Sequence, residues 1–164
     1  MKPVRREKTP YQTTADPLWA VLTVWTVVNS VNVLQALGFL SRVRTGGMAI
    51  NHVLGYVMIG LAVPAAFALA AFFRAGAGWL QWVGPVLYIA FIGLLIVVDY
   101  LRPVEFRSPA RGEILVPFLV LFFGSILLMG LPMFRVNRKL WLITVATTGF
   151  MLVSMITAMR KGVA

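Results

Sequence analysis

Apolar residues fill most of this chain in five long runs, and no run contains a charged residue. The runs cover residues 17–40, 48–73, 75–98, 114–134 and 140–159. Each run has the length of about 20 residues that a helix needs to cross a hydrocarbon core roughly 30 Å thick. Backbone polar groups in lipid must be satisfied within their own segment, so each run predicts a helix. We therefore expect an all-α integral membrane protein.

Turn residues between the runs set the expected boundaries. The predicted bundle of five transmembrane helices covers about residues 17–41, 48–73, 77–100, 113–134 and 139–160. We expect Pro64 to kink the second helix, Pro132 to end the fourth, and residues 135–139 to form a tight turn. Residues 1–16 are polar and basic, which predicts a flexible N-terminal arm. Residues 17–164 then form a single five-helix transmembrane domain.

Composition narrows the class of protein further. The chain has 164 residues with 60% hydrophobic content, so its short connections leave no room for an additional soluble domain. The net charge of +10 would suggest nucleic acid in a soluble protein. Here the basic residues lie at the ends of the predicted helices, where they contact lipid headgroups, so we expect membrane lipids and no nucleic acid as partners. The chain has no cysteine, which excludes disulfides and iron–sulfur ligation.

The distribution of Lys and Arg bears on orientation. Five spans place eight of these residues on the side of the N-terminus and seven on the other side. The first helix usually dominates insertion, and four basic residues precede it, so we predict a cytoplasmic N-terminus in the plasma (inner) membrane. Such a balanced count is also typical of a dual-topology protein that inserts in both directions.

The first predicted helix carries a polar residue at every third position. This polar ladder consists of Thr23, Thr26, Asn29, Asn32 and Gln35. Steps of three residues wind around a helix, so the ladder does not form one stripe. Carboxamides are costly against lipid, so we expect Asn29 and Asn32 to face protein or water. The ladder is interpreted as interhelical hydrogen bonding, with a polar path or ligand contact as the alternative.

Two further seams predict close helix packing. The last helix has Thr144, Thr147, Met151, Ser154 and Ala158 at alternating spacings of three and four, and the second has Ala62, Ala66 and Ala70. Small and weakly polar residues at these spacings allow helices to approach closely in lipid. We expect these two seams to form contacts within the chain, in a homo-oligomer or with a partner membrane subunit.

The connection between the third and fourth helices concentrates charge of both signs. It contains the charged residues Asp99, Arg102, Glu105, Arg107, Arg111 and Glu113. We predict an ordered loop at the membrane surface, held by exposed ion pairs that are each worth about 0–1 kcal/mol. The functional alternative is a loop that caps the bundle, docks a partner or binds a zwitterionic headgroup.

No set of residues in the sequence predicts catalysis. His52 is the single histidine, and a haem or metal needs more ligands than it supplies, so we expect no cofactor, no metal site and an interfacial role for His52. A His52–Met pair, or two His52 residues across a dimer axis, would be the only haem ligands. No Asp, Glu, Lys or Arg lies inside a run, which argues against ion-coupled transport.

We therefore predict a non-enzymatic polytopic membrane protein, an accessory, assembly or partner- or lipid-binding subunit. The alternative is a small oligomeric channel or transporter for a neutral or weakly polar solute, with the first helix lining the path.

Overall fold

The structure is a computed structural model that describes residues 17–47, 49–101, 104 and 111–162. Its elements are α1 (Leu18–Thr45), α2 (Ala49–Arg74), α3 (Trp79–Leu95), η1 (Ile96–Leu101), α4 (Gly112–Gly130), α5 (Met133–Val136) and α6 (Arg138–Arg160). The described residues contain no β-strand. Five helical segments are long and apolar enough to cross a membrane. The predicted all-α bundle is therefore confirmed.

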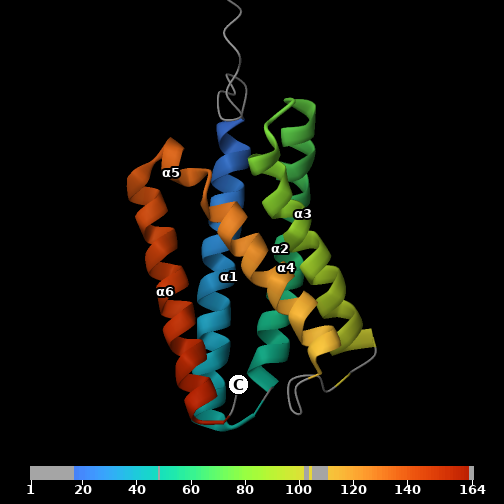
Figure 1. Cartoon of the computed structure of the whole chain (residues 1–164), viewed down its shortest axis with the longest axis vertical. Coiled ribbons are helices and arrows are strands. Elements are labelled where there is room, and N and C mark those ends of the chain that lie inside the picture. Colours follow the sequence, from blue (N-terminus) through green and yellow to red (C-terminus); the bar gives the residue numbers. More distant parts are fainter. Residues whose placement is uncertain (1–16, 48, 102–103, 105–110, 163–164) are drawn as a thin grey trace, which may run out of the picture.

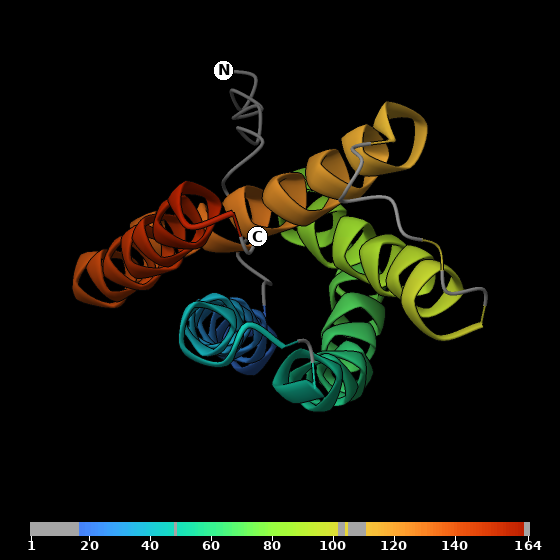
Figure 2. The same cartoon turned by 90° about the horizontal axis from the view of Figure 1, so that it is seen from below.

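The long helices run up and down beside one another (Figures 1 and 2). α1 packs most extensively against α6 and α2, and α3 packs most extensively against α4. α4 crosses α1 obliquely, while α4 and α6 have little contact with each other. We call the end where α1 begins the N-terminal end of the bundle, and the end where α6 finishes the C-terminal end.

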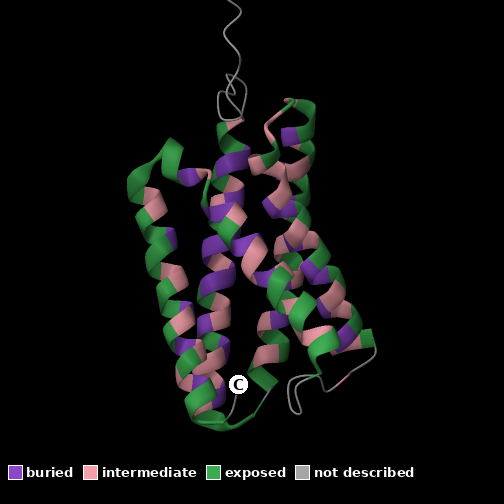
Figure 3. Ribbon diagram, viewed as in Figure 1, coloured by how far each residue is buried: buried purple, intermediate pink, exposed green. Residues whose placement is uncertain are grey.

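α1 is the most enclosed helix of the bundle (Figure 3). Its buried residues include neighbours in sequence, such as Val27 with Val28 and Val31 with Asn32. Neighbouring residues on a helix point about 100° apart, so burial of both means that other helices cover α1 on more than one side. The polar residues of α1 therefore meet different surroundings on different faces.

The connection between the fourth and fifth spans differs from the predicted tight turn at residues 135–139. α4 ends at Gly130, four residues earlier than expected, and α5 adds a single helical turn after Pro132. Asn137 then caps α6, because its Oδ1 accepts hydrogen bonds from the backbone N–H groups of Lys139 (3.0 Å) and Leu140 (3.3 Å). A helical turn and an N-cap thus replace the tight turn.

The third span also differs from the regular helix predicted at 77–100. From Ile96 to Leu101 the backbone adopts a π-helix, η1, with hydrogen bonds from residue i+5 to residue i. This pattern brings both Asp99 and Tyr100 about one turn beyond Leu95. All three residues line the same cavity, which is described below.

The strip of Ala62, Ala66 and Ala70 on α2 was predicted to allow close packing within the chain or in an oligomer, and of these residues only Ala62 packs against the core of the chain. Ala66 and Ala70 are exposed, and Ala65 and Ala68 are fully buried in their place. Spacing alone could not distinguish these two sets, because alanine occurs on both faces of this helix. Ala65 and Ala68 therefore make the buried contacts of this face, and the use of the exposed Ala66 and Ala70 in an oligomer stays a prediction.

Close packing between α3 and α4 depends on Gly84. A Cβ atom at this position would lie 2.7 Å from the backbone nitrogen of Met129. Any larger residue would push the two helices apart, so the absence of a side chain sets their separation here. This contact lies toward the N-terminal end of the bundle, where the core is filled.

All five tryptophans of the chain lie toward the N-terminal end. They are Trp19 and Trp25 on α1, Trp79 and Trp82 on α3, and Trp141 on α6. Trp82 stacks against Phe73 and Trp141 against Phe134, with ring centroids 5.4 and 5.0 Å apart. Trp and Tyr favour the interface between membrane and water, and the basic residues Arg74, Arg138 and Lys139 lie at the same end. The C-terminal end carries Tyr56 and Tyr100 instead.

Candidate functional site

Asn29 and Asn32 of α1 form a hydrogen-bonded seam with α6. The Asn29 Nδ2 donates to the Thr144 Oγ1 (3.1 Å), and the Asn29 Oδ1 accepts from the Thr147 hydroxyl (2.7 Å). The Asn32 Nδ2 reaches the Thr148 hydroxyl at 2.9 Å. Asn29 is 9% exposed and Asn32 is fully buried, which confirms that both carboxamides face protein. We call these five residues the α1–α6 seam.

The face of α6 that meets α1 follows the predicted spacing. Thr144, Met151, Ser154 and Ala158 are buried. Near the start of the seam, the Trp25 indole N–H donates to the backbone oxygen of Leu140 (3.0 Å). These contacts tie α1 to α6 along most of their length.

The remaining residues of the polar ladder do not belong to the seam. The hydroxyls of Thr23 and Thr26 each donate to a backbone oxygen one turn earlier in α1, both at 2.9 Å, and Thr26 is exposed. Gln35 points elsewhere, and its Nε2 donates to the Met58 sulfur of α2 at 3.3 Å. Thus the ladder divides among three environments, as its winding around the helix requires.

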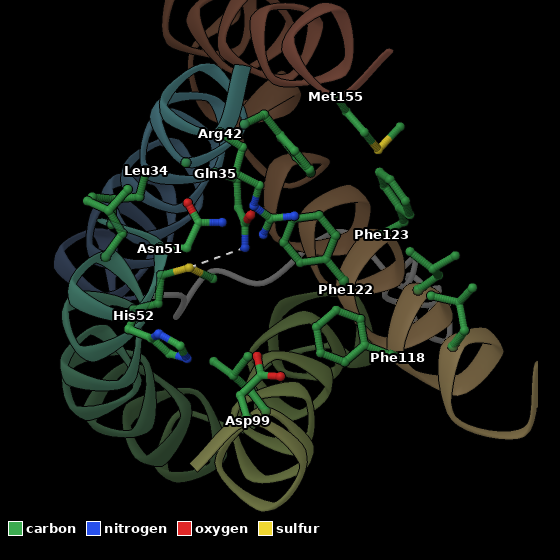
Figure 4. Close-up of a pocket in the computed structure, with 18 of the residues that line it drawn as sticks. Leu34, Gln35, Arg42, Asn51, His52, Asp99, Phe118, Phe122, Phe123 and Met155 are labelled. Atoms are coloured by element: carbon green, nitrogen blue, oxygen red, sulfur yellow. Dashed lines mark hydrogen bonds between the residues drawn. The ribbon is translucent and has the colours of Figure 1, made fainter. Parts of the chain in front are cut away.

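Gln35 lies at the edge of a partly open cavity of about 350 Å³ at the C-terminal end of the bundle. Five spans contribute to its lining. Figure 4 shows Gln35, Arg42, Asn51, His52 and Asp99 on one side of the cavity, and the apolar residues Phe118, Phe122, Phe123 and Met155 on the other. Its volume lies within the range of about 300–1,000 Å³ that is typical of small-molecule pockets.

Arg42, in the last turn of α1, is the most buried charged residue of the cavity at 9% exposed. The Asn51 carboxamide has one orientation in which both its oxygen and its nitrogen are hydrogen-bonded. In this orientation the Asn51 Oδ1 accepts hydrogen bonds from the Nε and Nη2 of Arg42. The Asn51 Nδ2 then donates to the backbone oxygen of Gly38 at 3.0 Å. The guanidinium carbon also lies 5.5 Å from the ring centroid of Phe39. These contacts hold the guanidinium at the cavity.

The short turn between α1 and α2 explains why Arg42 and Asn51 meet. Both residues lie four positions from the glycine pair at 46–47, so antiparallel helices bring them to the same level. Gly46 ends α1 with a φ of 66°, a left-handed conformation that favours glycine. Gly38 lets the Asn51 side chain approach, since a Cβ there would lie 3.1 Å from the terminal amide group of Asn51.

Asp99 and Tyr100 of η1 form the second polar part of the lining. The Tyr100 hydroxyl donates to the backbone oxygen of His52 at 2.9 Å. Its ring contacts those of Tyr56 and His52, with centroids 4.9 and 6.0 Å away. Gly55 allows this contact, because a Cβ at that position would overlap the Tyr100 hydroxyl. His52 therefore joins an aromatic group beside a carboxylate.

Aromatic residues close the inner end of the cavity. Phe122 lines it, and the Phe91 ring packs against Phe122 at 5.1 Å and against Phe118 at 5.0 Å. Phe91 and Tyr88 behind it are almost completely buried. The cavity thus has aromatic residues at its inner end, with a packed core beyond them, and most of its polar residues lie near the helix ends.

The predicted charged loop is described only in part. Arg102, Glu105 and Arg107 lie outside the described residues. Asp99 belongs to η1 and lines the cavity, Arg111 is the N-cap residue of α4, and Glu113 is exposed in the first turn of α4. The flexible arm predicted at 1–16 also lies outside the described residues. Among those that are described, no group of three or more His, Asp or Glu residues could hold a metal ion.

Gln35 and Asp99 were predicted from the sequence as site residues, whereas Arg42 was predicted only as an anchor at the membrane boundary. Arg42 and Asn51 lie at equal distances in sequence from the turn at 46–47. This spacing could have predicted that the two side chains meet. Tyr100 could not be placed, because an α-helical register does not bring it to the same face as Asp99 and Leu95.

Comparisons of the chain with known protein families, curated proteins and solved structures give no match. The functional argument therefore depends on the geometry of the site.

Proposed function

We propose that this chain is a non-enzymatic polytopic membrane protein that binds an amphipathic, lipid-like ligand in the cavity at its C-terminal end. The observation that carries the proposal is a mostly apolar lining in which Arg42, Asn51, His52 and Asp99 lie near the helix ends. Ligand pockets are mostly apolar, with a few polar groups that fix orientation. This proposal corresponds to the lipid-binding subunit that the sequence predicted.

The depth of the lining residues supports an amphipathic ligand. Arg42 lies three residues before the end of α1, His52 is the fourth residue of α2, and Asp99 lies two residues before the end of η1. Leu34, Met58 and Phe122 lie about two turns deeper. In a spanning helix this spacing puts the polar residues near the headgroups and the deeper apolar residues in the hydrocarbon. A ligand with a polar head and an apolar tail fits this gradient.

The packing beyond the cavity argues against the alternative of a solute channel within one chain. Beyond Phe122, the residues Phe91, Tyr88 and Met129 are almost fully buried. Gly84 is in close contact with the backbone of α4. A solute that entered the cavity would meet this packed core before reaching the N-terminal end.

We further propose that the chain resides in the plasma (inner) membrane with its N-terminus in the cytoplasm. The four basic residues before α1 and the basic residues Arg74, Arg135, Arg138 and Lys139 favour this orientation. The cavity then lies in the outer leaflet. Labelling of single cysteines introduced at positions 44 and 138 tests the orientation, because the natural chain has no cysteine.

Lipid analysis of the purified protein tests the proposed ligand. Native mass spectrometry of the chain in mild detergent should detect a bound amphiphile. Met155→Trp, which fills the cavity from α6, should reduce binding at least tenfold. Val153→Trp is the matched control, because it adds the same side chain to the exposed face of the same helix.

Leu119→Trp, on α4, provides a second way to fill the cavity if Met155→Trp fails to fold. Thermal unfolding in detergent identifies the variants that remain folded. Folded variants with a filled cavity and undiminished lipid binding would contradict the proposal, as would a natural protein that binds no lipid. Flux of a neutral solute into liposomes that contain the protein would support the channel instead.

A further inference from the structure

The five spans that line the cavity form a ring with one weak side. In the order α6, α1, α2, α3 and α4, each helix packs extensively against the next. The remaining pair, α4 and α6, has little contact among the residues that the structure describes. Figure 2 looks onto the C-terminal end of the bundle and shows the start of α4 apart from the end of α6. The ring is therefore open between α4 and α6.

The same two helices come together toward the N-terminal end. A Cβ atom at Gly130, the last residue of α4, would lie 3.0 Å from the Cγ2 of Thr144 on α6. The single turn of α5 then leads from α4 into α6. The gap between the two helices thus narrows from the C-terminal end of the bundle inward, and it does not run through to the N-terminal end.

Apolar side chains of the cavity form both edges of this gap. They are Leu115, Leu119 and Phe123 on α4 and Met155 and Met159 on α6, and we call these five residues the α4–α6 opening. Leu119 is 38% exposed and Met159 is 60% exposed, although both line the cavity. Phe123 and Met155 lie beside each other from the two helices in Figure 4. Residues that belong to the lining and to the outer surface at once show that the cavity reaches this surface.

The depth of the α4–α6 opening matches one leaflet. Leu115 is the fourth residue of α4, and Met159 is the second-last residue of α6. Phe123 lies about 12 Å deeper than Leu115, at 1.5 Å per residue. Half of a hydrocarbon core of about 30 Å has a similar thickness. The opening therefore faces the acyl chains of the leaflet at the C-terminal end.

We propose that the ligand is a lipid of this leaflet, and that it enters the cavity sideways from the bilayer through the α4–α6 opening. This inference rests on the proposed function, because it names the source of the ligand and its route into the same cavity. The headgroup stays at the membrane surface while the acyl chain passes between the two apolar edges.

The sideways route keeps the acyl chain in apolar surroundings throughout. Entry from the water at the C-terminal end would expose the chain to water, which the hydrophobic effect opposes. Entry along the bundle from the N-terminal end would have to pass the packed core at Tyr88 and Phe91. The α4–α6 opening alone offers a path on which the lipid also keeps the orientation that it has in its leaflet.

A reversible link across the opening tests the route. The double variant Phe123→Cys with Met155→Cys can be bridged by a bismaleimide linker that contains a reducible disulfide, because the natural chain has no cysteine. The full chain, with its unlabelled lipid bound, is transferred into vesicles of deuterated lipids from the expression host. Native mass spectrometry after extraction measures how fast a deuterated lipid replaces the unlabelled one.

We expect the bridge to slow this exchange at least tenfold and to leave the amount of bound lipid unchanged. Reduction of the linker should restore the rate. The matched control is Phe134→Cys with Trp141→Cys, whose rings lie 5.0 Å apart at the N-terminal end, outside the cavity. Its bridge should not change the rate, and neither should the linker on either single cysteine of the opening.

Leu119→Cys with Met159→Cys gives a second bridge across the opening if the first variant does not fold. Exchange that is equally fast with and without a bridge would overturn the inference. Bridges that form between two chains instead of within one would also overturn it, because a second copy would then occupy the opening. The proposed function survives either result if Met155→Trp still reduces lipid binding. A natural protein without bound lipid would contradict the proposed function itself.

Discussion

The helix α1 carries two polar clusters that use similar side chains in different surroundings. In the α1–α6 seam, Asn29 and Asn32 meet threonine hydroxyls of α6 directly. One turn further along, Gln35 reaches only the weakly accepting sulfur of Met58, at the edge of the cavity. The two clusters differ in whether a polar partner lies opposite on the neighbouring helix.

This difference separates a structural role from a binding role. Hydrogen bonds between side chains of neighbouring helices hold these helices together and leave little space between them. Polar groups that line a cavity leave room for a ligand, and they fix its orientation. A polar residue in a spanning helix is therefore interpreted from what lies opposite to it. Substitutions in the two clusters should affect different properties.

Loss of the seam should have the largest effect on stability. The double substitution Asn29→Leu and Asn32→Leu should lower the free energy of unfolding by about 1–3 kcal/mol, because each interhelical hydrogen bond is worth about 0.5–2 kcal/mol. Asn29→Leu alone should cost about 0.5–2 kcal/mol. Unfolding of the purified protein in mixed detergent micelles measures these changes, and lipid binding by the folded fraction should persist.

Thr26→Val is the control for the seam. Thr26 belongs to the same ladder, but its hydroxyl bonds only to its own helix and its side chain is exposed. We expect a change in unfolding free energy of less than about 0.5 kcal/mol. Raised stability in the leucine variants would contradict the assignment of a structural role to the seam.

Gly55→Ala should have a smaller effect on stability and a clear effect on the cavity. The added methyl group overlaps the Tyr100 hydroxyl, so the bond from Tyr100 to the His52 carbonyl must break or move. The cost is about 1 kcal/mol, the net worth of one hydrogen bond. Equilibrium unfolding measures this cost, and lipid binding should weaken several-fold as the Tyr100 ring moves.

Gly60→Ala, on the same helix, is the matched control. A Cβ at Gly60 meets nothing within 4 Å, and alanine favours a helix over glycine by about 0.5–1 kcal/mol. This variant should therefore be as stable as the natural protein or more stable. Equal behaviour of the two alanine variants would show that Tyr100 is not held by its contact with α2.

Gln35→Leu should have the smallest effect on stability. Its donor reaches only a thioether, so its removal should change the unfolding free energy by less than about 0.5 kcal/mol. The same measurement on Asn32→Leu should give a larger loss. A loss for Gln35→Leu that matched the loss for Asn32→Leu would remove the distinction between the two clusters.

The sequence predicted the number and approximate extent of the spans, because the length of an apolar run directly reflects the thickness of the membrane. The protein-facing position of Asn29 and Asn32 followed from the cost of a carboxamide in lipid. The pairing of Asn29 with Thr144 could not be predicted, because these residues lie 115 positions apart and nothing local relates α1 to α6. Spacing on α2 also failed to distinguish Ala65 and Ala68 from their exposed neighbours.

The cavity was beyond prediction for a second reason. Its polar lining depends on η1, where the change from α-helical to π-helical hydrogen bonding brings Asp99 and Tyr100 to one face. The apolar runs that predict a span do not reveal such a change of register. Arg42 was similarly interpreted as an anchor, since its contact with Asn51 arises only when α2 packs beside α1.

The placement of the tryptophans has an optical consequence. Intrinsic fluorescence of this protein comes from Trp19, Trp25, Trp79, Trp82 and Trp141. Trp25 is the one furthest along α1, and Arg42 lies about 25 Å beyond it at 1.5 Å per residue. Light emission therefore reports the interface at the N-terminal end and is insensitive to an occupant of the cavity. A lipid that carries a heavy-atom quencher in its headgroup will therefore reduce this fluorescence only from the leaflet at the N-terminal end of the bundle.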